Sequence, residues 1–408
     1  MSKNSALISL FERPMRLALI VGVAAGLLSV VGLFVSGPAS FFQAYLFAFM
    51  FWIGISLGSL ALLLLHILTG NRWGLAIRRI VEAGAANIWV MAILFVPLFF
   101  GLSTLYTWAR PADVAADPTL QLQSWYLNLT FFIGRAVLYF IVWIVLALFA
   151  NRSIARRAAA ATGEPQAEGN PGLGAGGLIL YVLTMTFAAI DWIMSLQPFW
   201  SSSVYGLLTI FGQVMTAMAF AIMILNLFPG LSLGKKWTHE TTPIPYRDLG
   251  AMTVTLIMGW AYLAYFQLLI IWAGNLPHEV AWYITRTQGG WSYVGIFVAL
   301  FQFAVPFLIL ISGRARHNLR VLAWMGGLLL FANLVNLFWN VKPAFYASFS
   351  INWLDFMVPI AIGGLWIAGF LFALKRRPAL SAAEEQALDP DPAAEKAIPN
   401  EVAQFKTK

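Results

Sequence analysis

The sequence predicts an all-α membrane protein with about ten transmembrane helices, and three observations lead to this prediction. The 408 residues are 60% hydrophobic and only 10% charged, whereas a soluble domain carries roughly 25% charged residues. Ten stretches have the roughly 20 mostly apolar residues that a helix needs to cross about 30 Å of hydrocarbon. Most basic residues lie between these stretches on one side of the membrane.

The ten predicted spans follow one another with mostly short connections. We expect them near Arg16–Ser36, Phe41–Leu68, Ala83–Tyr106, Trp125–Ala150, Leu173–Leu196, Ser203–Phe228, Leu249–Trp272, Trp291–Ser312, Val321–Trp339 and Trp353–Leu374. Two connections are long and polar, residues 151–171 and 229–248. An even number of spans places both ends of the chain on the same side.

The distribution of Lys and Arg predicts that this side is the cytoplasm. Twenty-one of the 25 basic residues then fall in cytoplasmic segments: Lys3, Arg13, Arg16, Arg72, Arg78, Arg79, Arg152, Arg156, Arg157, Lys235, Lys236, Arg247, Arg314, Arg316, Arg320, Lys375, Arg376, Arg377, Lys396, Lys406 and Lys408. The opposite side holds only Arg110, Arg286 and Lys342, and Arg135 lies inside a span. This is the bias of the positive-inside rule, so the net charge of +8 does not call for nucleic acid as a partner.

The spans divide the chain into three regions. Residues 1–15 form a cytoplasmic segment, residues 16–374 form the transmembrane domain, and residues 375–408 form a polar cytoplasmic tail. The long loop between the fourth and fifth spans divides the chain, and spans two to five and six to nine suggest two four-helix bundles, at about 41–196 and 203–340. The first and tenth spans are then two outer helices.

Arg135 and Asp191 are the charged residues that most need an explanation. Both lie inside apolar spans, where an ionisable group is costly unless it is paired or hydrated. Antiparallel packing of spans four and five brings them to a similar depth, so we expect an ion pair. Asn128 and Tyr139 share a helical face with Arg135 and are expected to point into the bundle with it. The pair could fix helix register, or it could serve a proton relay or a quinone site.

Other polar groups are candidates for proton movement or helix packing. His66 and Glu82, near the cytoplasmic ends of spans two and three, could form a proton-entry mouth. They could equally belong to a solvated interfacial cluster neutralised by Arg78 or Arg79. Six amides in spans six to nine are expected to form hydrogen bonds between helices: Gln213, Gln267, Gln302, Asn333, Asn336 and Asn340.

The chain carries no motif for a catalytic or redox centre of its own. Cys is absent, which excludes disulfides, thiolate metal sites and iron–sulfur ligation by this chain. Of four His residues only His66 lies in a span, so we expect neither a bound metal nor an intramembrane haem. Nucleotide-binding, hydrolase and zinc-protease motifs do not occur.

Several ordered blocks resemble one known family. The runs DWIMSL (191–196) and FWSSSVYG (199–206) look like a segment of the membrane subunits of alternative complex III, the bacterial quinol:electron-acceptor oxidoreductase. The blocks YRDLG (246–250), WAYLAYFQ (260–267) and IWAGNLPHE (271–279) resemble further signatures of those subunits. The resemblance covers residues 189–339 closely. Its fold belongs to the polysulfide-reductase-like (NrfD-type) superfamily, and the chain length resembles that of the shorter, F-type subunit.

The resemblance implies a subunit of a larger complex in the bacterial inner membrane. Its expected role is to scaffold a quinol-oxidising electron-transfer complex, and it could also conduct protons, through His66, Glu82, Arg135, Tyr139 and Asp191. The implied partners are the larger NrfD-like subunit, an iron–sulfur subunit, multihaem cytochrome c subunits and lipids. Haem and iron–sulfur clusters then belong to those partners, with quinone bound in the complex. The chain itself would be a non-catalytic subunit.

Two other functions remain open. Arg135, Asp191 and Trp192 could bind the quinone or quinol directly. An independent secondary transporter would need interrupted helices with charged groups at the midplane, and although Pro97 and Pro306 interrupt spans, no cluster of charge accompanies them.

The charge bias predicts the topology of the chain. Reporter fusions should place residue 15 and Lys408 in the cytoplasm and the loop Pro111–Ser124 on the opposite side. A reporter at Lys408 that is active only outside the cytoplasm would contradict the assignment.

Overall fold

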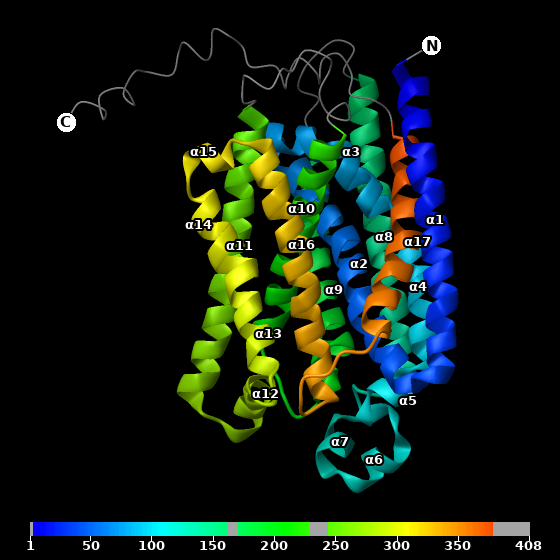
Figure 1. Ribbon diagram of the computed structural model, residues 1–408, viewed down its shortest axis with the longest axis vertical. Helices are drawn as coiled ribbons and strands as arrows, with labels where there is room; N and C mark the ends of the chain where they lie inside the picture. The colour runs from blue at the N-terminus through cyan, green and yellow to red at the C-terminus, as the bar shows by residue number, and fades with distance from the viewer. Residues whose placement is uncertain (1–2, 161–169, 229–243, 378–408) are drawn as a thin grey trace, which may run out of the picture.

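The computed structural model describes residues 3–160, 170–228 and 244–377, and these form only helices and their connections (Figure 1). Ten helical segments are long and apolar enough to cross a membrane. The prediction of an all-α polytopic membrane protein is confirmed. The central parts of the two long polar loops (161–169 and 229–243) and the tail at 378–408 lie outside the described residues.

Eight spans are single helices and two are interrupted. The single helices are α1 (Lys3–Val35), α2 (Gly37–Thr69), α8 (Leu129–Ala160), α9 (Pro171–Trp192), α10 (Tyr205–Leu227), α11 (Ile244–Gly274), α16 (Leu319–Val341) and α17 (Leu354–Lys375). The third span joins α3 (Arg72–Ala86) to α4 (Ile88–Phe100), and the eighth joins α13 (Trp291–Val298) through a π-helical turn to α14 (Val305–Leu310). Short helices connect the spans: α5 (Leu102–Leu105), α6 (Pro111–Ala116), α7 (Pro118–Gln123), α12 (Pro277–Thr287) and α15 (Gly313–Arg316).

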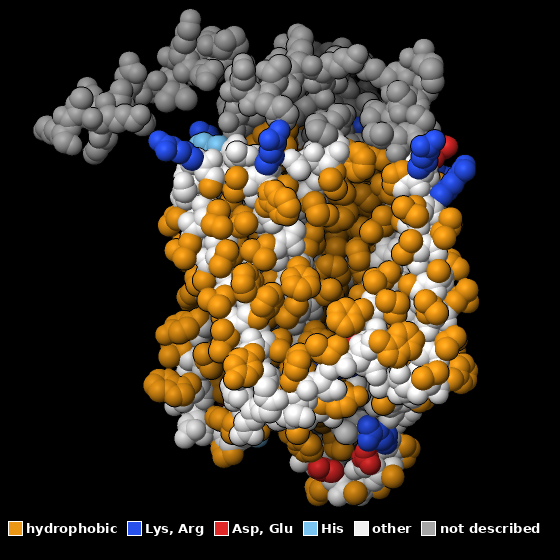
Figure 2. All heavy atoms as spheres, in the orientation of Figure 1, with side chains coloured by type: hydrophobic (Ala, Val, Ile, Leu, Met, Phe, Trp, Pro, Cys, Tyr) orange, Lys and Arg blue, Asp and Glu red, His pale blue; other side chains and the backbone are white. Residues whose placement is uncertain are grey.

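The charged side chains agree with the predicted orientation. α1 begins and α17 ends at the same end of the molecule, and Lys and Arg side chains gather there, while the flanks are covered with hydrophobic side chains (Figures 1 and 2). We call this the cytoplasmic end, following the charge distribution, and the opposite end the far end. The helices α6 and α7 project from the far end (Figure 1).

The third span begins earlier than predicted. Ala83 was expected to open it, but the apolar segment starts at Trp73, so Arg78, Arg79 and Glu82 lie on α3 and not in a loop or at its edge. All three side chains are buried. Hydropathy alone could not find this helix, because its charged residues lower the mean hydropathy of a segment whose apolar residues pack against α2 and α17.

Helix α2 lies at the centre of the molecule, and its side chains are almost all buried. It contacts helices from both predicted four-helix sets, among them α9, α10 and α16. Gly54 and Gly58 form a GxxxG motif on the face toward α10, where a Cβ on Gly58 would lie 2.2 Å from the carbonyl oxygen of Gln213. Small residues at this spacing let helix backbones approach closely, and this explains the central packing. The division into two bundles stays a prediction.

The two outer helices, α1 and α17, pack against each other along their length (Figure 1). They approach closely at Gly22 and Gly364, where a Cβ on Gly22 would lie 2.7 Å from the backbone nitrogen of Leu365. By contrast, a Cβ on Gly26, one turn further along α1, would meet nothing within 4 Å. The pairing therefore depends on Gly22 and not on Gly26.

The π-helical turn at Ala299–Ala304 precedes Pro306. Proline has no N–H to continue the helical ladder and its ring crowds the preceding turn, so the helix widens before it. The widened turn directs Gln302 into the protein, where its side chain is fully buried. Its Nε2 donates to Oδ1 of Asn333 on α16 (3.4 Å).

Gly22→Val should destabilise the protein by about 1–3 kcal/mol, because the added side chain overpacks the contact between α1 and α17. Gly26→Val is the matched control and should change stability much less. Thermal unfolding of both purified variants in detergent measures the difference, and equal shifts for the two would contradict the packing argument.

Candidate functional site

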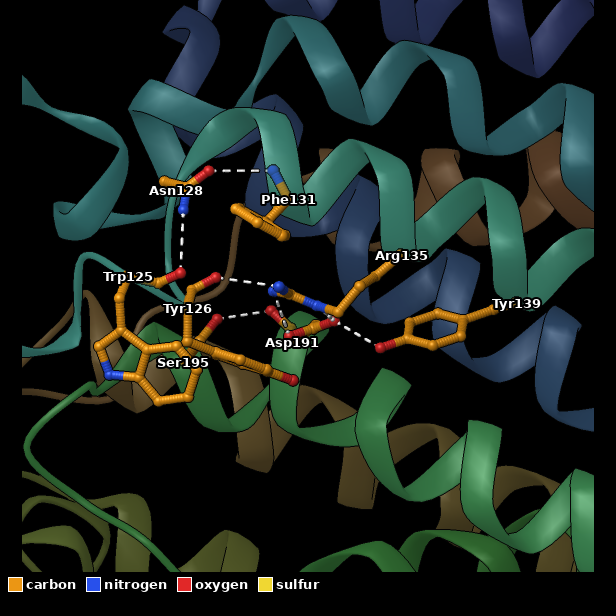
Figure 3. A network of polar contacts seen from close by, with 8 residues as sticks. All are labelled: Trp125, Tyr126, Asn128, Phe131, Arg135, Tyr139, Asp191 and Ser195. Carbon is orange, nitrogen blue, oxygen red and sulfur yellow. Dashed lines mark hydrogen bonds and ion pairs between the residues drawn. The ribbon is translucent and has the colours of Figure 1, made fainter.

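Arg135 of α8 and Asp191 of α9 form a two-pronged ion pair, as predicted (Figure 3). The Arg135 Nε lies 2.8 Å from Asp191 Oδ2, and the Arg135 Nη2 lies 2.9 Å from Asp191 Oδ1. The Asp191 side chain is 1% exposed and that of Arg135 is 15% exposed. Parallel N–H···O bonds between a guanidinium and a carboxylate are among the strongest hydrogen bonds in proteins, and they fix direction as well as distance.

Two tyrosines complete the network around the ion pair. The Tyr139 hydroxyl donates to Asp191 Oδ2 (2.8 Å). The Arg135 guanidinium lies 3.8 Å from the centre of the Tyr126 ring, and its Nη1 donates to the Tyr126 carbonyl (2.9 Å). Tyr126 precedes the span, and burial together with the Asp191 charge raises its pKa to about 12. Each edge of the guanidinium and both carboxylate oxygens therefore have partners.

The pair lies closer to the far end than the sequence suggested. We expected span four to begin at Trp125, but α8 begins at Leu129, so Arg135 is in its second turn. Asp191 is in the last turn of α9, and the Ser195 hydroxyl donates to its carbonyl. The prediction that Asn128 shares the inward face is wrong. Its Oδ1 instead accepts from the Phe131 N–H (2.9 Å), because Asn128 precedes the helix and satisfies a free amide there (Figure 3).

Trp192 lies beside the pair but in an apolar setting. It is 1% exposed and surrounded by rings from several helices, among them Phe95 (4.8 Å between centroids) and Phe140 (6.0 Å). The Tyr106 hydroxyl donates to its carbonyl (2.8 Å). The aromatic packing fills the volume next to Asp191, and a quinone at Arg135, Asp191 and Trp192 stays a prediction.

His66 and Glu82 have different partners. His66, in the last turn of α2, packs edge-on against Trp73 and beside Gly74. Glu82 lies eight residues beyond Gly74, about 12 Å further along α3 by the helical rise. Its Oε1 is 3.5 Å from Arg78 Nε. Arg78 thus neutralises Glu82, as expected for an interfacial cluster. The cluster is not solvated, however, because both side chains are buried.

The predicted amides join helices. The Tyr181 hydroxyl donates to Gln213 Oε1 (2.8 Å), and the Tyr205 hydroxyl donates to Asn340 Oδ1 (3.1 Å). Bonds of Gln267 and Gln302 also cross between elements, and this confirms the prediction for these four residues and for Asn333. Asn336 differs, because its side chain accepts from Asn340 on its own helix.

A cavity of about 30 Å³ lies among these amides, which is room for about two water molecules. Its polar lining comes from α10, α11 and α16. The residues are Tyr205, Thr209, Gln213, Trp260, Asn333, Asn336 and Asn340, with Met50, Gly54, Ile193, Leu208, Gly212 and Leu337 completing the wall.

Sequence reasoning missed two charged groups that the structure buries at the far end. Lys342, which was counted as a loop cation, is 1% exposed and lies 2.8 Å from Asp355 on α17. A signal existed, because a base and an acid occur at the facing ends of two consecutive spans.

Arg286 on α12 is the second missed group. It is buried, and its guanidinium stacks on the Trp282 ring (3.7 Å). It donates to Gln197 Oε1 (3.0 Å) and to the Asn340 carbonyl (2.7 Å). Burial lowers the pKa of Arg286. No carboxylate contacts it among the described residues, so carbonyl oxygens and a ring take the place of a counter-ion.

Within the described ranges no three His, Asp or Glu side chains lie close enough to hold a metal ion. Comparison of the chain with protein-family models found no match, and comparison with curated proteins found none either. The functional argument therefore depends on the residues and their geometry.

Replacing Arg135 or Asp191 alone by Leu should cost about 3–5 kcal/mol, because the remaining charge is left buried without its partner. The double variant should recover much of this loss if the pair is structural. Denaturant unfolding in detergent measures the free energy of unfolding of the two single variants and the double variant. Tyr139→Phe, which removes one neutral hydrogen bond, is the milder control. A double variant as unstable as either single variant would contradict compensation between the two charges.

Proposed function

We propose that this multi-pass membrane protein is a scaffold subunit of a quinol-oxidising electron-transfer complex of the alternative complex III type, in a bacterial inner membrane. The proposal rests on the resemblance of residues 189–339 to subunits of that complex. It also rests on what the resembling residues do in the structure, which is to tie the far ends of the helices together.

The two resembling runs at 191–196 and 199–206 make the corner between α9 and α10. Asp191 binds Arg135 of α8 through two hydrogen bonds. Trp200 stacks on Trp282 of α12, with 4.6 Å between ring centroids and 16° between planes. These contacts join three parts of the chain through buried side chains, and they support a structural role for the run.

The next residues of the run extend the links to α11 and α16. The Ser202 hydroxyl donates to Gln267 Oε1 (3.0 Å), and Gln267 is itself in the resembling block WAYLAYFQ (260–267). The Tyr205 hydroxyl donates to Asn340 near the end of α16. The observation that carries the proposal is this network across the far end, in which Ser202 bonds to Gln267 within the resembling segments. Asp191 and Tyr205 of the resembling runs bond to Arg135 and Asn340 outside them. The network ties the far ends of several helices to one another through buried groups, and under this proposal a peripheral redox subunit binds at that end.

Proton conduction is the second candidate function, and the cavity among the amides favours it. Tyr205, Thr209 and Gln213 supply hydroxyl and amide groups along its wall, and these groups can both donate and accept hydrogen bonds. The Arg135–Asp191 pair is less suited to a relay, since both carboxylate oxygens already accept strong hydrogen bonds.

Under this proposal the partners carry the redox centres. They are a larger NrfD-like subunit, an iron–sulfur subunit and multihaem cytochrome c subunits, with quinone or quinol bound elsewhere in the complex and lipids around the helices. The chain described here contributes the membrane frame.

Purification of the tagged full-length chain from its own membranes in mild detergent tests the proposal. We expect haem and iron–sulfur proteins to co-purify in fixed ratio with the chain. Recovery of the chain without them would overturn the proposal.

Asp191→Leu should lower the haem recovered per chain, and the additional Arg135→Leu should restore it, because the pair holds the frame together. If the double variant assembles fully but quinol oxidation or the coupled proton release falls, then the pair serves a relay or a quinone site and not only the frame.

A further inference from the structure

One face of α11 is exposed along the whole membrane-spanning length, at one side of the molecule (Figure 1). Its large side chains recur at steps of four and three residues: Met258, Tyr262, Tyr265, Leu269 and Trp272. The opposite face of the helix packs against α10, α3 and α14. The apolar members of the exposed face suit lipid, but the two tyrosines do not.

Both tyrosines lie near the middle of the membrane. The span runs from Tyr246 to Gly274, and its central residue is 260. By the rise of a helix, Tyr262 is about 3 Å and Tyr265 about 8 Å from this centre, while the hydrocarbon extends about 15 Å to each side. Side chains on a helix tilt toward its N-terminus, so the Tyr265 ring leans toward the membrane centre and away from the far boundary.

Neither hydroxyl is satisfied by the part of the chain that the structure describes. Tyr262 is 62% and Tyr265 is 63% exposed, and neither has a hydrogen-bond partner among the residues that the structure describes. Thr255, the other hydroxyl on this face, donates to the carbonyl of Ala251 (3.0 Å). Tyr293 is 77% exposed, but it lies at the start of α13, where water can reach its hydroxyl. Among the hydroxyl groups of the described ranges, only those of Tyr262 and Tyr265 combine exposure, depth and an open donor.

The Tyr262 ring is also held in place. It stacks on Phe266 one turn away, with 5.6 Å between centroids and 14° between planes. A fixed hydroxyl in hydrocarbon loses the bonds it would make in water unless another molecule supplies an acceptor. Lipid chains supply none.

We propose that this face of α11 is the docking surface for a membrane-spanning helix of a different protein, one with small residues opposite Tyr262 and Tyr265. Small residues let helices approach closely in a bilayer and expose backbone carbonyls. Such carbonyls, or Ser and Thr hydroxyls, accept the two tyrosine hydrogen bonds. A second copy of this chain fits less well. A parallel two-fold pair would set tyrosine rings opposite tyrosine rings and hold the helix axes apart.

Site-specific photocrosslinking in native membranes tests the occupant. Benzoyl-phenylalanine at position 262 or 265 should form a crosslink to a membrane-spanning peptide of another chain that co-purifies in fixed ratio. The control is position 20 on α1, where Ile20 is 65% exposed at a similar depth, and where we expect lipid adducts only. A crosslinked dimer of this chain, or the same lipid adducts at 262 and 265 as at 20, would overturn the proposal.

The double variant Tyr262→Phe/Tyr265→Phe tests the hydrogen bonds without removing the rings. We expect at least a threefold loss of the bound partner as detergent is raised, and no change for Tyr293→Phe. Retention equal to that of the unaltered chain would overturn the role of the hydroxyls.

The inference goes beyond the proposed function and can fail separately. A crosslink at position 262 to a protein without redox partners would support docking and contradict the proposed complex. Co-purification of haem proteins, with only lipid adducts at position 262, would support the complex and contradict docking.

Discussion

The absence of water from the bilayer interior is the constraint on which this structure depends. A charge inside the membrane must find its partner within the protein, and in two cases here the partner comes from a different span. Arg135 of α8 holds Asp191 of α9, and Lys342 after α16 holds Asp355 of α17. Each pair therefore fixes the relative depth of two consecutive spans. Hydrophobic burial cannot fix the relative depth of two helices. When one apolar helix slides past another, the apolar contacts that it loses are replaced by similar contacts with lipid.

The sequence predicts well those features that depend on one span at a time. Ten apolar stretches and the distribution of Lys and Arg led to the correct helix number, and the Arg135–Asp191 pair followed from the antiparallel order of adjacent spans. The start of α3 could not be found in this way. Arg78 and Glu82 neutralise each other one turn apart, so a segment that reads as a polar loop is a buried helix.

Features that depend on which helices become neighbours were beyond sequence reasoning. All ten spans have similar hydropathy, yet α2 is almost fully buried and α1 is mostly exposed. Gly54 and Gly58 mark α2 as a close-packing helix, but glycines also occur on α1, where a Cβ on Gly26 would meet nothing within 4 Å. A glycine predicts a close approach only when the partner is known. Lys342 is a second example. The sequence alone predicts a loop cation, and only the structure shows that Asp355 lies beside it.

The two ion pairs differ in how the helix dipoles act on their charges. The C-terminal end of a helix favours positive charge and the N-terminal end favours negative charge. Lys342 directly follows α16 and Asp355 is in the first turn of α17, so both charges lie at favourable ends. Asp191 lies in the last turn of α9, at the unfavourable end for a carboxylate. Its charge is therefore balanced by Arg135 and Tyr139 without help from its own helix, and this explains why the pair has two parallel hydrogen bonds and a third from a tyrosine.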